Sequence, residues 1–360
     1  MEINKKIRQL VFYLKSKGWK WTWNYLHFIT FYDTKNPILI KYLQWFHPYP
    51  SYIEVECTTR CPIKCKHCEH TWWNEPSIDM SFEQFKHIFD QFPNLKWIGM
   101  TGIGEEFINP DFMDMLRYVK HKKPDVFIEL YDSFLFLDEK KISEIIDLGI
   151  ERIFASIDGA TKETYEKVRV GAKWEKVVKN IETFVRLKKE KNAYFPQLCF
   201  HYIVTKDNFH EMKKYVEWVS SLGTDVKLIQ FSRMLHFYKE AKDLFIEVPE
   251  KMIKEVEKKA DELGINVVWS LDVPQNKPLI NRCTAFMMPF IFVNGDVIPC
   301  CAQNEGNRRE WQHKTSMGNI FNERFENIWN GKRYRDLIRK IRKNETPEAC
   351  RGCPLFEVKK

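Results

Sequence analysis

The stretch EVECTTRCPIKCKHCEH, from Glu54 to His70, places four cysteines within twelve residues. The cysteines come directly after the apolar alternation of Tyr52, Ile53 and Val55, which predicts a short strand at 52–55. A soft-metal site is therefore expected to begin where that strand ends. Three of the cysteines, Cys61, Cys65 and Cys68, have the spacing C-x3-C-x2-C, which lets a loop wrap three thiolates around one face of a four-iron, four-sulfur (4Fe-4S) cluster. Three ligands leave one iron open to a chelating small molecule, as a three-ligand zinc site stays open to water.

Other interpretations of these cysteines remain open. A zinc site could recruit His67 and His70, although their spacing is irregular. The spacing C-x3-C also describes Cys57 and Cys61, which would shift the ligand set by one cysteine. A disulfide is disfavoured because thiols stay reduced in the cytosol and the N-terminus lacks a signal-peptide core. Buried structural cysteines rarely cluster this densely, and the spacing favours an iron-sulfur cluster over zinc.

The run from Arg60 to Cys68 resembles the signature of radical S-adenosylmethionine (SAM) enzymes, and the resemblance extends over residues 52–353. In that family three cysteines hold a 4Fe-4S cluster whose open iron binds the amino and carboxylate groups of SAM. The resemblance implies that Cys61, Cys65 and Cys68 are those ligands and that Cys57 is a spare thiol at the strand end.

The composition of the chain limits the classes of partner and the compartment that can be expected. The chain has 360 residues, a mass of 43.4 kDa, a net charge of +8 and 15% aromatic residues. A basic, aromatic chain could bind nucleic acid or a membrane. Lys and Glu alternate along the helical stretches as on solvated faces, so no nucleic-acid partner is predicted. No stretch approaches the roughly 20 apolar residues that span a bilayer. The cysteines group toward both ends of the chain as ligand sets would in a reducing compartment, so we expect a cytoplasmic location.

Residues 1–50 are expected to form a helical extension in which aromatic side chains alternate with Lys and Arg. Such a segment could lie on a membrane surface. We favour packing of its aromatic residues on the main domain, because the apolar positions are not confined to one narrow face. Peripheral membrane contact therefore remains the less favoured alternative.

Residues 51–272 show a strand-then-helix rhythm that predicts parallel strands with right-handed crossovers. The fold class expected is α/β, a partial (β/α)6 TIM-like barrel with the N-terminal extension and a small C-terminal iron-sulfur domain at 273–360. Barrels of this kind carry their chemistry at the carboxyl ends of the strands. The predicted strands are Tyr52–Glu56, Trp97–Thr101, Phe127–Tyr131, Arg152–Ile157, Leu198–Thr205 and Lys227–Phe231, with Ile265–Ser270 as a candidate further strand. Ser81, Asp138 and Thr161 lie at N-cap positions of the helical patterns between them.

The loop after the second strand contains Gly102, Gly104 and Glu105, which resemble the family's glycine-glycine-glutamate segment. That resemblance implies a contact with the amino group of SAM. Physically, glycine lets a backbone approach a ligand closely and a carboxylate favours an ammonium group. The family usually has proline after the glutamate, whereas this chain has Glu106.

Other strand ends supply further candidate residues through the same resemblance. Ser156 and Asp158 match the ribose-contacting strand end, Arg169 matches an arginine near the cofactor carboxylate, and His67 lies where the adenine is expected. Tyr131-Asp132-Ser133 replaces the usual Thr-Asn-Gly, so Asp132 is a candidate substrate contact.

A second cysteine set follows a polar stretch at 272–277. Asn294-Gly295 between apolar runs predicts a hairpin, and Cys350 and Cys353 form a C-x2-C pair. The spacing resembles the opening of a SPASM domain, here in a shorter twitch-type version. It implies one auxiliary 4Fe-4S cluster with four thiolates, and a structural zinc ribbon is the alternative. The candidate ligands are Cys283, Cys350, Cys353 and one of Cys300 and Cys301. The isolated Cys199 is expected to be a buried small hydrophobe.

The resemblance implies an oxidoreductase or maturase that cleaves SAM reductively and removes hydrogen from a substrate. It also implies an external one-electron reductant of the flavodoxin or ferredoxin type. We expect a peptide or protein substrate, with oxidation or rearrangement of a sugar-like or lipid substrate as the alternative. An iron-sulfur electron carrier and a zinc-stabilised nucleic-acid binder are the non-enzyme alternatives.

Overall fold

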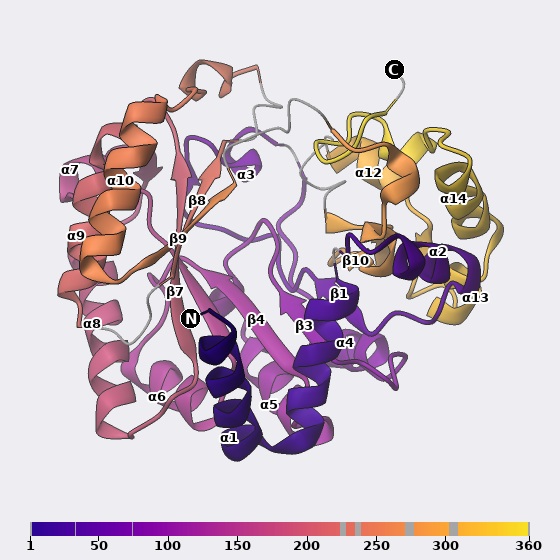
Figure 1. Ribbon diagram of the computed structural model, residues 1–360, viewed down its shortest axis with the longest axis horizontal. Helices are drawn as coiled ribbons and strands as arrows, with labels where there is room; N and C mark the ends of the chain where they lie inside the picture. Colours follow the sequence, from indigo (N-terminus) through magenta and orange to yellow (C-terminus); the bar gives the residue numbers. More distant parts are fainter. Residues whose placement is uncertain are drawn as a thin grey trace.

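A ten-stranded sheet runs through the computed structural model, with helices covering its outer side (Figure 1). The structure describes residues 2–32, 34–73, 75–223, 228–234, 239–270, 277–301 and 309–358. No helix within these ranges is both long enough and apolar enough to cross a membrane.

The helices alternate with strands through the middle of the chain. The α-helices are α1 (Glu2–Phe31), α2 (Pro37–Phe46), α3 (Glu69–Trp72), α4 (Phe82–Phe89), α5 (Phe112–Lys122), α6 (Glu139–Asp147), α7 (Lys162–Val168), α8 (Trp174–Glu190), α9 (Met212–Ser221), α10 (Glu250–Leu263), α12 (Arg309–Lys314), α13 (Phe325–Trp329) and α14 (Lys332–Arg342). The strands are β1 (Tyr52–Val55), β2 (Lys64–Cys65), β3 (Trp97–Met100), β4 (Phe127–Asp132), β5 (Arg152–Ser156), β6 (Arg169–Val170), β7 (Gln197–Val204), β8 (Leu228–Arg233), β9 (Asn266–Ser270), β10 (Phe290–Ile291), β11 (Asp296–Ile298) and β12 (Gly318–Asn319).

Seven strands run parallel in the order β1-β3-β4-β5-β7-β8-β9. Each lies within two residues of a predicted strand, except that the predicted start at Lys227 lies outside the described residues. The sheet does not close on itself, which confirms the predicted partial barrel. Predicted helix caps are also present, because Ser81, Asp138 and Thr161 each accept a backbone hydrogen bond at the start of a helix.

The C-terminal strands extend the same sheet. β10 pairs in parallel with β1, so Glu54 lies opposite Phe290, and β11 and β12 continue antiparallel. The predicted hairpin at Asn294-Gly295 joins β10 to β11, and Gly295 has φ of 86°, a left-handed conformation that favours glycine. The C-terminal region is therefore joined to the barrel by backbone hydrogen bonds. The predicted boundary near residue 272 lies outside the described residues.

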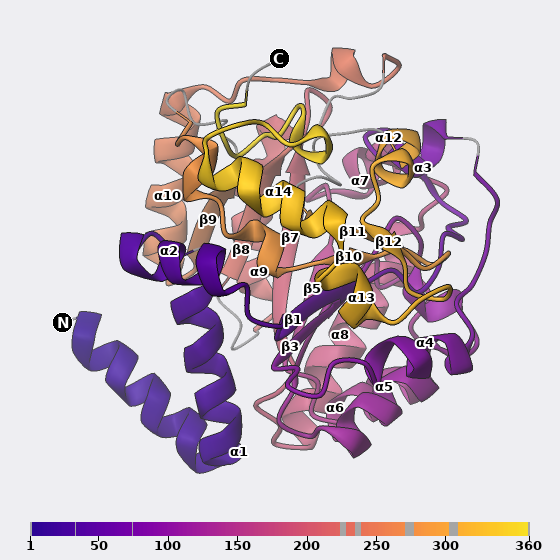
Figure 2. The same ribbon diagram turned by 90° about the vertical axis from the view of Figure 1, so that its right-hand side faces the viewer.

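The N-terminal helix α1 packs across the starts of the strands, which confirms packing on the main domain for part of its aromatic side chains. Trp21 is buried, stacks 5.7 Å from the ring of Phe127, and its Nε1 donates to Glu151 Oε1 at 3.0 Å. Lys17 also donates to Glu151, at 3.2 Å. α1 thus covers the amino-terminal end of the sheet, while α2 lies beside α14 of the C-terminal region (Figure 2).

Candidate active site

The cysteine loop is held against the barrel by a small two-stranded sheet. β2 pairs with β6 so that Cys65 lies opposite Arg169. Thr71 Oγ1 donates to the carbonyl of Cys65 at 2.7 Å, and the amide of Cys68 donates to the same carbonyl at 3.1 Å. These bonds fold residues 61–68 into a compact loop, and Cys61, Cys65 and Cys68 all line one cavity at the carboxyl ends of the strands.

The three thiols fit a metal cluster. Burial raises the pKa of Cys61 above its usual value, and the nearby Glu105, Cys65 and Cys68 add to the rise. Burial also raises the pKa of Cys65, to about 12, and that of Cys68. Buried thiols close to one another become thiolates only if a cation compensates, which bound iron would do. Within the described ranges, no group of three or more Cys, His, Asp or Glu side chains is placed to hold a single metal ion.

The loop after β3 presents a buried carboxylate to the same cavity. Glu105 is buried, and its Oε1 has no hydrogen-bond partner among the residues that the structure describes. An orphaned carboxylate oxygen at a cavity wall suits an ammonium ligand. Gly102 and Gly104 also line the cavity, and their contact with a cofactor stays a prediction. A methyl group on Gly102 would overlap the side chain of Glu56, and one on Gly104 would overlap Thr58. The two glycines allow close packing of this loop on the end of β1.

Asp158 organises the charged residues on the other side of the cysteine loop. It is buried, accepts a hydrogen bond from Arg169 Nε at 2.7 Å and another from the amide of Ile203 at 2.7 Å. Burial opposes its ionisation, but Arg169 and His67 outweigh burial and lower its pKa. Asp158 does not line the cavity, whereas Ser156, Arg169 and His67 do. Its predicted contact with the ribose therefore stays a prediction. In the structure, the carboxylate of Asp158 supports the guanidinium of Arg169.

His67 is buried, with Nε2 3.5 Å from Asp158 Oδ2, and its Nδ1 has no partner. Burial lowers its pKa to about 4, so the ring is neutral at pH 7. A neutral ring with one unpartnered nitrogen in the cavity wall can donate or accept a hydrogen bond to a bound group.

Asp132 and Glu106 are two further buried carboxyl groups near Glu105. Asp132 Oδ1 accepts from the amide of Phe134 at 2.6 Å, while its Oδ2 has no partner. Burial and the neighbouring Glu105 raise the pKa of Asp132 well above its usual value. Burial raises the pKa of Glu106 in the same way. Carboxyl groups held neutral can donate a hydrogen bond, so Asp132 can serve a substrate as a donor.

The opposite wall of the cavity comes from the last parallel strands. It is lined by His201 of β7, Gln230, Ser232 and Arg233 of β8, and Trp269 of β9. His201 Nε2 lies 2.9 Å from Ser232 Oγ, and Gln230 donates to the same oxygen at 3.2 Å. The cavity has a volume of about 660 Å³. Its cysteine side and its polar side together enclose space for a cofactor and part of a substrate.

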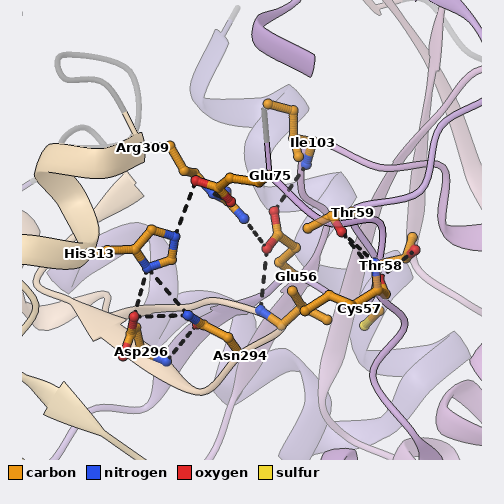
Figure 3. A network of polar contacts seen from close by, with 12 residues as sticks. Glu56, Cys57, Thr58, Thr59, Glu75, Ile103, Asn294, Asp296, Arg309 and His313 are labelled. Carbon is orange, nitrogen blue, oxygen red and sulfur yellow. Dashed lines mark hydrogen bonds and ion pairs between the residues drawn. The ribbon is translucent and has the colours of Figure 1, made fainter. Parts of the chain in front are cut away.

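A buried ion-pair network joins the cysteine loop to the C-terminal region (Figure 3). Glu56, at the end of β1, pairs with Arg309 of α12 and accepts from the amides of Ile103 at 3.4 Å and Val293 at 3.3 Å. The amide of Arg309 donates to Glu69 Oε1 at 3.3 Å. Arg309 therefore contacts residues that precede and follow the three cysteines, and it holds both ends of their loop.

The network continues from Arg309 to the hairpin of the C-terminal region. Arg309 Nε lies 3.4 Å from Glu75, and His313 lies between Glu75 at 3.5 Å and Asp296 at 2.7 Å (Figure 3). Burial alone would lower the pKa of His313, but its hydrogen bonds to Asp296 and Glu75 raise it to about 9.

Sequence reasoning missed this network. The one available signal was a glutamate inside an apolar strand, since buried carboxylates require partners. Nothing local indicates that Glu56 meets Arg309, which lies 253 positions further along the chain.

The second cysteine set also converges. Burial raises the pKa of Cys350 well above its usual value, and Cys300, Cys283 and Cys353 contribute to the rise, so each of these three thiols lies within electrostatic reach of Cys350. Cys301 packs instead against Phe290, Phe292 and Ile298. All ten cysteines of the chain are thiols, and Cys199 is buried in the core. Pro354 and Leu355, directly after Cys353, line the cavity of the first set.

Two family models match this chain in the regions that carry the two cysteine sets. A model described as the radical SAM superfamily matches residues 55–219. A model described as SPASM, an iron-sulfur cluster-binding domain, matches residues 283–354.

Individual proteins match over most of the chain. The tungsten-containing aldehyde ferredoxin oxidoreductase cofactor-modifying protein of Pyrococcus furiosus is 26% identical over 85% of this chain and 88% of its own. The AdoMet-dependent heme synthase of Methanosarcina barkeri is 24% identical over 86% of this chain and 89% of its own. The crystal structure of Streptococcus suis SuiB bound to precursor peptide SuiA has a TM-score of 0.62 at 12% identity, over 86% of this chain and 70% of that one. The structural similarity shows that this chain shares the fold of SuiB.

Proposed function

We propose that this chain, which belongs to the radical SAM superfamily and carries a C-terminal SPASM domain, removes a hydrogen atom from a peptide or protein substrate. When bound, a 4Fe-4S cluster and SAM supply a 5′-deoxyadenosyl radical. The observation that carries the proposal is the meeting of three thiols and a Glu105 carboxylate oxygen at one cavity, where that oxygen has no hydrogen-bond partner among the described residues.

The residues around the cavity have distinct proposed roles. Cys61, Cys65 and Cys68 would hold the cluster, and Glu105 would accept hydrogen bonds from the amino group of SAM. Arg169, fixed by Asp158, would bind the carboxylate of SAM, because a guanidinium held in place binds an anion at little entropic cost. These contacts orient the cofactor, and the buried walls keep water away from the reacting atoms.

Cys283, Cys300, Cys350 and Cys353 are the proposed ligands of one auxiliary cluster. Cys300 is chosen over Cys301 because its thiol acts on Cys350, whereas Cys301 packs among apolar side chains. Four protein ligands would close this site to other ligands, and such a cluster can accept an electron from a substrate radical. An external one-electron reductant would supply the electron that SAM cleavage consumes. Cysteines grouped as metal ligands fit a reducing compartment, so we propose a cytoplasmic location.

The residues that line the cavity and the neighbouring edge of the sheet support a peptide as substrate. Gln230 and Ser232 on the wall opposite the cysteines, and Asp132 near Glu105, offer hydrogen-bonding groups to a peptide. β9 is the last strand of the sheet within the described residues, and Trp269 and Ser270 at its carboxyl end line the cavity. An extended peptide can add to such an edge through backbone hydrogen bonds.

Modification of a metal cofactor or tetrapyrrole is the second candidate function. It is favoured by two relatives that align with this chain over most of both lengths, one a cofactor-modifying protein and the other a heme synthase. Arg233 and Trp269 in the cavity wall would suit an anionic, planar substrate.

One assay tests the proposal and separates the candidates. Anaerobically reconstituted protein is reduced in the presence of SAM, and release of 5′-deoxyadenosine is measured with a low-mass cell extract before and after proteinase treatment. Stimulation that proteinase abolishes supports the peptide substrate, and stimulation that survives supports the cofactor substrate. Absence of 5′-deoxyadenosine under all conditions would refute radical SAM activity.

A further inference from the structure

Helix α2 presents a row of large apolar side chains outward. Ile38, Tyr42, Trp45 and Phe46 follow helical spacing and are 76%, 44%, 69% and 73% exposed. The opposite side of the helix packs inward through Ile40 and Leu43. Solvent-exposed Trp and Phe side chains in one row on a surface helix mark an interaction surface.

Helix α1 adds to this apolar surface. While Trp21 is buried, Trp19 and Trp23 are 67% and 59% exposed. Between the end of α1 and α2 lies an apolar hollow of about 270 Å³, lined by Phe31, Tyr42 and Met287 among others. The extension therefore has two sides, one packed on the barrel and one bearing tryptophan, phenylalanine and isoleucine toward solvent.

Positive charge is concentrated in the same segment. Residues 1–50 contain eight Lys and Arg but two Asp and Glu, so they carry six of the eight net positive charges of the whole chain. Lys15, Lys20, Lys35 and Lys41 are exposed. Residues 51–360 are therefore close to neutral, and the basic character of the protein belongs to the segment that exposes the aromatic residues.

We propose that the outward side of α1 and α2 binds the surface of a bilayer that contains anionic lipids. Trp and Phe side chains insert at the boundary between headgroups and acyl chains, and lysines beside them attract anionic headgroups. A second copy of this chain would also cover apolar side chains, but two such surfaces would bring six net positive charges against six. α1 lies across the starts of the strands, so this attachment leaves the cavity at their carboxyl ends accessible. The inference does not depend on the proposed reaction.

Vesicle sedimentation with the full chain tests the proposal. Vesicles of phosphatidylglycerol and phosphatidylcholine at equal ratio are compared with vesicles of phosphatidylcholine alone. We expect binding to the anionic vesicles that weakens at 0.5 M salt, and little binding to the neutral ones. Lys41→Glu should weaken binding by at least about fivefold, since each surface lysine contributes about that factor. Its control, Lys254→Glu on exposed α10, should leave binding unchanged.

The apolar contribution is tested with Trp45→Ser combined with Phe46→Ser. We expect about tenfold weaker binding to anionic vesicles at an unchanged thermal midpoint, because both side chains are exposed in the free protein. Leu263→Ser on α10 is the matched control. Equal binding by the double variant and the parent would overturn the proposal, as would absence of binding to anionic vesicles. A concentration-dependent dimer that the double variant abolishes would also overturn it in favour of a second copy.

Discussion

The two cysteine sets of this protein differ in the number of thiols and in the spacing of those thiols along the chain. Cys61, Cys65 and Cys68 come from one short loop and face a cavity, whereas the thiols of the second set come from positions up to 70 residues apart and face one another. Three ligands leave a metal position for a small molecule, and four leave none. In the proposed function, the difference in the number of thiols would separate a reaction centre from an electron acceptor.

The largest expected effect comes from removing one ligand of the open set. Cys65→Ala should reduce 5′-deoxyadenosine release to the background of the assay and lower iron from about eight to about four per chain. Cys57→Ala is the control, because this buried thiol lies at the end of β1 and outside the cavity lining. If the Cys57 variant lost activity while the Cys65 variant kept it, the ligand set would be shifted by one cysteine.

Removing a ligand of the closed set should separate the two sites. Cys350→Ala is expected to lose about four irons per chain while retaining SAM cleavage in the absence of substrate. Cys300→Ala should behave in the same way, and Cys301→Ala should retain all iron. Iron and sulfide analysis with electron paramagnetic resonance checks each variant. Loss of iron in the Cys301 variant alone would reverse the assignment of the fourth ligand.

The contact between the two regions can be weakened at Arg309. Arg309→Met leaves Glu56 buried without its partner, which costs about 3–5 kcal/mol of folding stability. We also expect roughly tenfold weaker SAM binding, since Glu56 supports the loop that contains Gly102 and Glu105. SAM binding is followed by the change it causes in the spectrum of the reduced cluster.

Two further variants separate the effect of the unpaired Glu56 charge from that of losing any arginine. Glu56→Gln in the Arg309→Met background should recover part of the stability, because it removes the unpaired charge. Arg324→Met, on an exposed arginine, should change neither property. Unchanged SAM binding in the destabilised Arg309 variant would show that the pair serves folding alone.

The smallest effect concerns pH. The folded-state pKa of His313 is about 9, above its unfolded value of 6.5, so its protonation stabilises the fold below pH 6.5. This contribution is lost as pH rises from 6.5 to 9 and is at most about 3 kcal/mol, at about 1.4 kcal/mol for each unit of pKa. Chemical unfolding at several pH values should show it, and His313→Gln should flatten that pH dependence. His121→Gln is the matched control, and identical profiles for parent and His313 variant would refute the role of this histidine.

Patterns that depend on neighbouring residues were predictable from the sequence. The alternation at 52–55, the Ser81 cap and the Asn294-Gly295 turn each report local backbone preferences, and the structure has the elements that they predict. The meeting of the candidate residues at one cavity also followed, because parallel strands bring their carboxyl ends together.

Contacts between distant segments were not predictable. No local signal indicates that β10 pairs with β1, that Asp158 is turned toward Arg169, or that Arg309 meets Glu56. Which side of α1 packs on the barrel was also not predictable: Trp21 is buried and Trp23 is exposed, although both are large aromatic residues on different sides of the same helix. Such choices depend on which surfaces the tertiary structure brings together.

The position of Arg309 has a consequence for the order in which the protein is made. The ribosome completes Glu56, the cysteine loop and Glu69 long before Arg309 emerges, so a nascent barrel has the iron-binding loop without the residue that holds both of its ends. We expect that metal loading follows completion of translation, and that a stalled or truncated product stays empty of iron. The last fifth of the polypeptide would thus act as a checkpoint for maturation.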